Sequence, residues 1–266
     1  YASRGLGDVY KRQFYLCTNL KSIAIPDSVT KIENITFTGC SSLTSISIPE
    51  SVTYIGLDAF KDCTSLTSIY IPDSVTLTGL SGTFSGCTSL TNVKLPDVIY
   101  IISTNTFAGC SSLLNIIIPD SVTSIKECAF EGCKSLTNIA IPESVTKIKT
   151  WAFKDCTSLK SIAINNPDCE ISNAKDTIPE TAVIYGYKNS TAQTYAESFN
   201  RKFISLEEIG DISGNGEIDL YDAIEIAKAI MGLRTFTAEE MIIADFNKDG
   251  TVDLYDAIEI AKTLLP

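Results

Sequence analysis

The chain has 266 residues, 44% of them apolar, which is enough to bury one or two hydrophobic cores. Its net charge of −11 argues against a nucleic-acid-binding surface, and no stretch approaches the roughly 20 apolar residues of a membrane span. Histidine is absent, which removes the commonest general base and any Ser-His-Asp or Cys-His arrangement within these residues.

The negative charge is concentrated near the carboxyl end. Residues 211–266 hold 12 acidic and 4 basic side chains, a net charge of −8, which leaves −3 of the total −11 for all other residues. Paired carboxylates could still support acid–base chemistry. We find no acidic pair outside this segment with a reason to converge, so we expect no catalytic residues in the chain.

The first 13 residues do not fit the pattern that begins at Phe14. The sequence has neither an initiator methionine nor a signal peptide, so we expect a fragment or a processed form. Residues 1–13 are expected to be a non-native or disordered leader.

A repeat of about 23 residues follows from residue 14 to residue 171. Its marker is a cysteine at spacings of 23, 23, 24, 23, 23 and 23, namely Cys17, Cys40, Cys63, Cys87, Cys110, Cys133 and Cys156. A unit this short cannot bury its apolar face alone, so the period predicts a solenoid of short parallel strands. Apolar residues such as Leu43, Ile46 and Ile48 face inward, and a proline ends each strand. A phenylalanine column fills the core from the far side: Phe37, Phe60, Phe84, Phe107, Phe130 and Phe153.

This unit resembles the BspA-type, or Treponema-type, leucine-rich repeat of bacterial surface and secreted proteins. The resemblance implies a protein-binding or adhesion surface and no chemistry of its own. We interpret the cysteine column as buried, reduced thiols, because parallel Cβ vectors disfavour a disulfide. Cys128 and Cys169 lie outside the column, and without a Cys-x-x-Cys pair or histidine a zinc site is not expected.

Two columns of strand residues are expected to face outward and form the recognition surface of the repeats, on a concave sheet. One column lies between the two inward positions: Ala24, Ser47, Tyr70, Lys94, Ile117, Ala140 and Ala163. The adjacent column is Ser22, Ser45, Ser68, Asn92, Asn115, Asn138 and Ser161. A merely solvated sheet face would look much the same.

Residues 172–209 are expected to cap the solenoid and to link it to the last domain. The pattern breaks at Asn165-Asn166-Pro167, and Ser190-x-x-Gln193 predicts a capping box that opens a helix running to about Phe199. The link after this helix is short and acidic.

Residues 210–266 contain two calcium-type loops, each 12 residues long. Oxygen-bearing side chains stand at positions 1, 3, 5, 9 and 12, a glycine stands at position 6, and the backbone carbonyl of position 7 adds one more ligand. The proposed ligands are Asp211, Ser213, Asn215, Glu217, Asp219 and Asp222 in loop one, and Asp245, Asn247, Asp249, Thr251, Asp253 and Asp256 in loop two. Loop two offers four carboxylates against three and is predicted to bind calcium more tightly.

Each loop is followed by the same helix, because residues 219–228 and 253–262 are identical at an offset of 34. Position 12 is Asp rather than Glu, and Gly210 directly precedes loop one, so no entering helix is expected there. Thr237-x-x-Glu240 predicts a short helix that brings Ile242 and Ile243 to a shared core.

This duplicated unit resembles a type I dockerin, the module by which cellulosome components bind cohesin modules on a scaffold protein. The resemblance implies a fold of small helices organised by two calcium ions, and it places the cohesin-binding residues at Leu220, Tyr221, Ala227 and Lys228 and, symmetrically, at Leu254, Tyr255, Ala261 and Lys262. Inward packing of the two leucines is the alternative. The identical faces suggest docking in either of two orientations.

Three functions remain in view. The leading hypothesis is a secreted, extracellular or cell-surface, non-catalytic component of a cellulosome-like complex, with the repeats as a binding surface. The alternatives are a fragment of a dockerin-bearing polysaccharide-degrading enzyme whose catalytic domain is missing, and a calcium-stabilised adhesin that binds no cohesin.

Overall fold

The computed structural model describes residues 12–75, 80–207, 209–247 and 251–265. The chain divides into two compact units, Tyr1–Phe203 and Ile204–Pro266. The expectation for the leader falls almost wholly outside the described residues.

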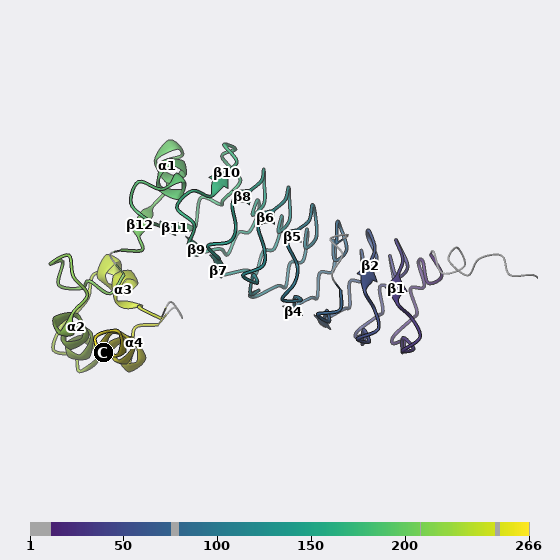
Figure 1. Ribbon diagram of the computed structural model, residues 1–266, viewed down its shortest axis with the longest axis horizontal. Coiled ribbons are helices and arrows are strands. Elements are labelled where there is room, and N and C mark those ends of the chain that lie inside the picture. Colours follow the sequence, from purple (N-terminus) through teal and green to yellow (C-terminus); the bar gives the residue numbers. More distant parts are fainter. Residues whose placement is uncertain (1–11, 76–79, 208, 248–250, 266) are drawn as a thin grey trace, which may run out of the picture. The chain divides into compact units, whose positions relative to one another are not determined.

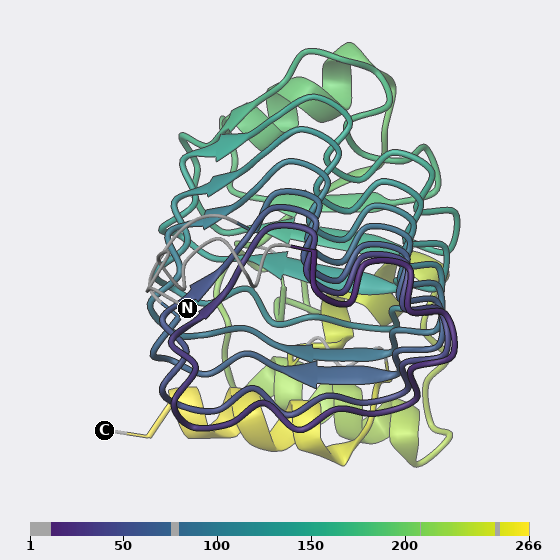
Figure 2. The ribbon, with the colours of Figure 1, turned by 90° about the vertical axis from the view of Figure 1, so that its right-hand side faces the viewer.

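The first unit is a parallel β-solenoid whose turns stack one on another (Figures 1 and 2). One column of strands contains the pair β1 (Lys31–Ile32) and β2 (Tyr54–Ile55) and a four-stranded sheet in the order β10-β8-β6-β5. The members of this sheet are β5 (Ile101–Ile102), β6 (Ser124–Ile125), β8 (Lys147–Ile148) and β10 (Glu170–Ile171). Ser124 pairs with Lys147, one repeat away, so the hydrogen-bond register equals the sequence period.

The second column of strands comes from the Leu-x-x-Leu-x-Leu segments. It starts with a bridge between Ala24 and Ser47, continues with β3 (Ser68–Tyr70) and β4 (Asn92–Lys94), and ends in the sheet β12-β11-β9-β7. The members of that sheet are β7 (Asn138–Ile141), β9 (Ser161–Ile164), β11 (Val183–Gly186) and β12 (Phe203–Ser205). Residues 115–118 have no assigned strand, so the ladder is interrupted between β4 and β7.

The core follows the predicted columns. Each residue of the Phe column from Phe60 to Phe153 is fully buried, and Phe37 is 2% exposed. Successive rings from Phe14 to Phe153 lie 5.2 to 5.7 Å apart with nearly parallel planes. Each repeat therefore packs its ring against both neighbours, and the core is continuous along the stack.

The cysteine column is a row of buried thiols, as predicted, and all nine cysteines are free. Each buried thiol from Cys40 to Cys156 lies 3.0 to 3.2 Å from the carbonyl oxygen of a phenylalanine one repeat earlier. Burial, which disfavours the charged thiolate, is the main reason why the pKa values of Cys63 and Cys110 are raised to about 12. Cys17 differs because it is exposed at the first described turn.

The two cysteines outside the column have different environments. Cys169 is fully buried in the core, whereas Cys128 is half-buried and has a left-handed φ of 54°. Asp58, Asn105 and Trp151 occupy the same place in their repeats with similar positive φ values. A recurrent left-handed turn thus places this residue, and the cysteine there is incidental to it.

The outward columns are exposed as predicted except at their last residues, where Ser161 is half-buried and Ala163 is buried. Tyr70 and Ile117 are 49% and 85% exposed, whereas Ala163 is only 8% exposed. Ala163 is flanked in register by Ala140 and Tyr185. A small side chain beside the larger tyrosine on the next strand loses its access to solvent.

The end of the solenoid is closed by α1 (Thr191–Ser198) and by the last two strands of the sheet. The Ser190 side chain accepts a hydrogen bond from the Gln193 N–H, as the predicted capping box requires. The Gln193 side chain accepts from the Asn189 N–H at 2.7 Å rather than from Ser190 itself. The helix ends at Ser198 with Phe199 as its C-cap, in agreement with the predicted end near Phe199.

The second unit contains α2 (Leu220–Ile230), α3 (Ala238–Ala244) and α4 (Leu254–Thr263). Its small core includes Ala223 and Ile226 of α2 and the equivalent Ala257 and Ile260 of α4. Thr237 and Glu240 form the predicted capping box of α3. Ile243 packs against this core as predicted, and the side chain of Ile242 lies outside the described residues.

Candidate metal loops and helix faces

Loop one curls around the carboxylate of Asp211. This carboxylate accepts hydrogen bonds from the Ser213 hydroxyl and from the N–H groups of Asn215 and Gly216, at 3.2, 3.1 and 2.8 Å. Gly214 and Gly216 have φ values of 71° and 89°, which only glycine adopts without strain. The backbone of loop one therefore wraps around this carboxylate at position 1.

The last predicted ligand, Asp222, belongs both to the loop and to α2. It is fully buried, and its two oxygens accept from the N–H groups of Ser213 at 2.9 Å and Asp219 at 2.7 Å. Asp219 is the N-cap of α2, and its side chain accepts from the Tyr221 N–H. Positions 9 and 12 therefore form the capping box of the helix that they precede.

Loop two repeats this arrangement where it is described. Asp256 is fully buried and accepts from the N–H groups of Asn247 at 3.1 Å and Asp253 at 2.9 Å. Asp253 caps α4 as Asp219 caps α2. Asp249 and Gly250 lie outside the described residues.

The loops suit calcium in the kind and the order of their predicted ligand atoms, which are all oxygens. Asp222 and Asp256 are buried carboxylates, and a bound cation would offset the cost of burying their charge. Among the described residues, no three acidic, cysteine or histidine side chains stand together as a metal group. Three carboxylates repel one another at close range, which disfavours their convergence without a cation.

The predicted docking residues lie on the outer faces of α2 and α4. Leu220 and Tyr221 are 59% and 69% exposed, and Leu254 and Tyr255 are 57% and 68% exposed. The alternative of inward-facing leucines is thus wrong. Ala227 and Ala261 are half-buried, and Lys228 and Lys262 are held by Glu225 and Glu259 at 2.7 and 2.5 Å.

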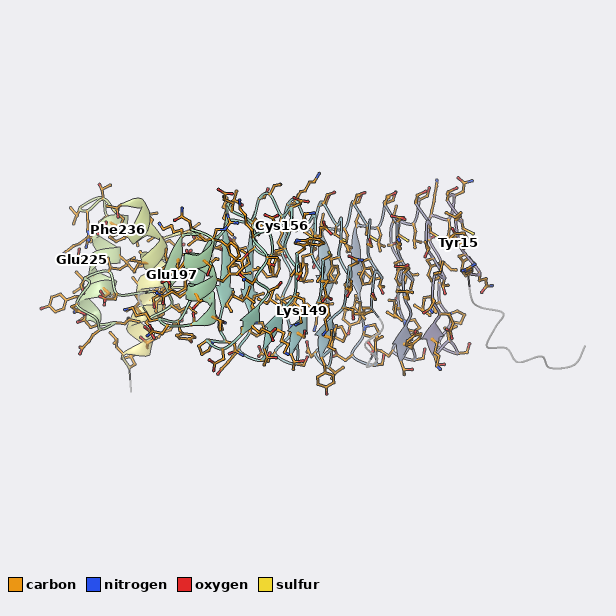
Figure 3. All side chains as sticks on the ribbon, turned by 90° about the horizontal axis from the view of Figure 1, so that it is seen from above. Tyr15, Lys149, Cys156, Glu197, Glu225 and Phe236 are labelled. Carbon is orange, nitrogen blue, oxygen red and sulfur yellow. The ribbon has the colours of Figure 1, made fainter. Side chains whose placement is uncertain are left out.

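Sequence reasoning missed two features of this unit. Ile224 and Ile258, one helical turn after the leucines, are 40% and 39% exposed, and the spacing i, i+4 could have revealed them. The second feature is Arg234, which forms ion pairs with Glu225 and Glu240 and stacks on the Phe236 ring at 5.0 Å (Glu225 and Phe236 are labelled in Figure 3).

Family comparisons match both units. The model of the BspA type leucine rich repeat region matches in six copies over residues 7–101 and 80–175, which is more than half of the chain. The chain belongs to the BspA-type leucine-rich repeat family. The model of the dockerin type I domain matches residues 209–265, so the second unit is a type I dockerin. No curated protein matches the chain.

Solved structures support the repeat fold. A leucine-rich repeat protein from Bacteroides ovatus is 28% identical with a TM-score of 0.54, over 73% of this chain and 57% of that protein. A leucine-rich repeat protein from Eubacterium ventriosum is 25% identical with a TM-score of 0.53, over 61% of this chain and 43% of that protein. The chain therefore spans only about half the length of these relatives.

The leucine-rich repeats and the dockerin are non-catalytic modules, and a dockerin is a protein–protein interaction module that binds calcium. No catalytic domain is identified in the chain. Among the helices that the structure describes, none has the length and apolar character needed to cross a membrane.

Proposed function

We propose that this chain is a non-catalytic, secreted component of a cellulosome-like complex. Its dockerin binds a cohesin of a scaffold protein, and its repeats present a second binding surface. The observation that carries this proposal is the pair of matched, exposed Leu-Tyr faces, each directly following a calcium-type loop. Large exposed apolar side chains on a small soluble unit point to a protein partner.

Calcium is the proposed organiser of the dockerin, with one ion in each loop. In loop one the ligands are Asp211, Ser213, Asn215, the Glu217 carbonyl, Asp219 and Asp222. In loop two they are Asp245, Asn247, Asp249, the Thr251 carbonyl, Asp253 and Asp256. Because two of these residues also cap each helix, an ion held by the loop would stabilise the start of the helix that carries the docking face.

The two faces are proposed to act as alternative cohesin-binding sites. Their exposed residues match pairwise in identity and in exposure, so a cohesin that recognises one face meets the same side chains on the other. A tyrosine anchor beside a leucine, with one lysine further along the helix, suits a small interface with a buried aromatic centre.

The test is capture of the full chain by a panel of immobilised cohesins, in calcium and in EGTA. We expect binding to at least one cohesin in calcium and none in EGTA. Tyr221→Ala and Tyr255→Ala should each retain binding, since the other face remains, and the double variant should lose it. Tyr187→Ala, an exposed tyrosine of the repeat unit, is the matched control. Calcium-independent capture, or full binding by the double variant, would contradict the proposal.

A further inference from the structure

The three central repeats, which start at Cys63, Cys87 and Cys110, depart from the others at exposed positions. Five large side chains stand where the equivalent positions of the other repeats hold mostly serine, threonine, alanine or lysine. They are 36 to 85% exposed: Tyr70, Val98, Tyr100, Leu114 and Ile117. Repeats that lack them fold in the same way, so the fold itself does not require these side chains.

Three of these replacements give up a hydrogen bond between repeats. Ser51, Ser74, Ser121 and Ser144 each donate to a carbonyl of the preceding repeat, and Val98 stands at that position. Thr53, Thr123 and Thr146 do the same at the position of Tyr100. Thr44, Thr67 and Thr91 do so at the position of Leu114. Valine and leucine cannot donate, and a tyrosine hydroxyl is too far from its own backbone to replace a threonine hydroxyl.

The direction of Ile117 is set by its neighbours. Ile116 and Ile118 are 6% and 5% exposed, whereas Ile117 between them is 85% exposed, so its side chain points out of the core. Tyr70 lies in register with Lys94 on the neighbouring strand, and Ile117 holds the same place in the next repeat. Tyr70 and Ile117 therefore stand on either side of Lys94 on the outward face of three consecutive turns, and together with the exposed Leu114 they are called the apolar patch.

An acidic column borders this patch. One exposed carboxylate per repeat follows the strand-ending proline, from the first described turn onward: Asp27, Glu50, Asp73, Asp97, Asp120 and Glu143. In the sequence of each repeat, this carboxylate comes after the exposed strand residues and before the positions that Val98 and Tyr100 occupy. Lys94 offsets part of this charge by an ion pair with Asp97 at 2.6 Å. A row of like charges attracts basic partners and repels a second copy of a chain whose net charge is −11.

We propose that the central repeats bind a polypeptide segment that carries both basic and apolar side chains. The apolar side chains of the partner contact Tyr70, Leu114 and Ile117, and its basic side chains face the acidic column. This inference rests on the part of the proposed function that gives the repeats a binding role, and it is independent of the dockerin.

The test uses a fluorescein-labelled model peptide of alternating leucine and lysine, about 12 residues and so roughly 40 Å when extended. Its binding to the full chain is followed by fluorescence anisotropy. Tyr70→Ser, Leu114→Thr and Ile117→Ser restore the residues that the same columns hold elsewhere, so the fold is expected to persist. Their combination should weaken peptide binding on the order of tenfold or more. Leu57→Ser, an exposed leucine outside the patch, is the matched control.

The acidic column is tested with Asp73→Asn and Asp120→Asn together, against Asp62→Asn as an exposed acid outside the column. The double variant should bind more weakly and with less dependence on salt, whereas the control should not change. Equal binding by the triple apolar variant, or by a leucine–glutamate peptide, overturns the proposal. A lack of peptide binding by the parent chain also overturns it. The proposal fails as well if the triple variant changes the binding of a polysaccharide, or changes self-association measured by sedimentation, instead of peptide binding.

Cohesin capture separates this proposal from the docking function. The triple variant should bind cohesin in calcium as the parent chain does, and EGTA should leave peptide binding by the parent chain unchanged. If the parent chain binds the peptide but no cohesin captures it, only the proposed docking function is refuted.

Discussion

The backbone N–H of Ser213 donates to one oxygen of Asp222 at 2.9 Å, across nine positions of the chain. The other oxygen of the same carboxylate accepts from the Asp219 N–H and so caps α2. A single buried side chain thereby closes the loop and starts the helix that carries the proposed cohesin-binding residues Leu220 and Tyr221.

This double role predicts that Asp222→Ala destabilises the dockerin even without calcium. Loss of the cap and of a buried hydrogen-bond acceptor should cost about 1 to 2 kcal/mol. Helical circular dichroism of the full chain during thermal unfolding, in calcium and in EGTA, measures this. Asp256→Ala is the matched variant of loop two and should behave alike. If Asp222→Ala left the thermal stability of the helices in EGTA unchanged, the carboxylate would act only as a calcium ligand.

The two loops are predicted to differ in calcium affinity. Loop two has four carboxylate ligands against three in loop one, with Asp249 outside the described residues, and ligand charge raises affinity. Calorimetric titration of Asp211→Ala, which keeps loop two, should therefore reveal tighter binding than titration of Asp245→Ala, which keeps loop one. Equal or reversed affinities would refute the prediction.

The phenylalanine column should dominate the stability of the repeat unit. Phe107 is fully buried and stacks on Phe84 and Phe130 at 5.6 and 5.4 Å, so Phe107→Ala should cost about 3 to 5 kcal/mol in urea unfolding. Phe14→Ala should cost less, because Phe14 is only partly buried. Trp151→Ala, at a side chain that is 46% exposed, serves as the control. A similar cost at Phe14 and Phe107 would contradict a core built by stacking on both sides.

The buried thiols should make the repeat unit sensitive to alkali. Burial raises the pKa of Cys63 and of Cys110 from 9.0 to about 12, so above pH 9 the unfolded chain releases protons that the folded chain keeps. The stability is therefore fully present below about pH 9 and decreases as the pH rises toward 12, by about 1 kcal/mol per thiol near pH 10. Urea unfolding at pH 8 and pH 10 measures the loss. Cys63→Ala should be less stable than the parent at pH 8, but its free energy of unfolding should decrease less between pH 8 and pH 10. An equal decrease in the variant and the parent would rule out this thiol as a cause.

The repeat fold could be read from the sequence because each column is nearly invariant within the chain. Almost every turn repeats the same inward Cys, Leu, Ile and Phe, with Val93 and Leu95 replacing the two isoleucines in one turn, and stacking is the only way such short units bury them. The loops of the dockerin were equally readable, because ligand order and the position of glycine follow from the geometry of a turning backbone.

The sequence by itself determined the period, the core columns, the order of calcium-type ligands and the starts of the helices, since these depend on local spacing and on side-chain chemistry. Tertiary structure alone decided that Ala163 is shielded beside Tyr185, that Arg234 links Glu225 to Glu240, and that Leu220 and Leu254 face outward. Such contacts join residues of different elements, and the packing of those elements depends on many weak interactions at once, which no pattern in a single segment records.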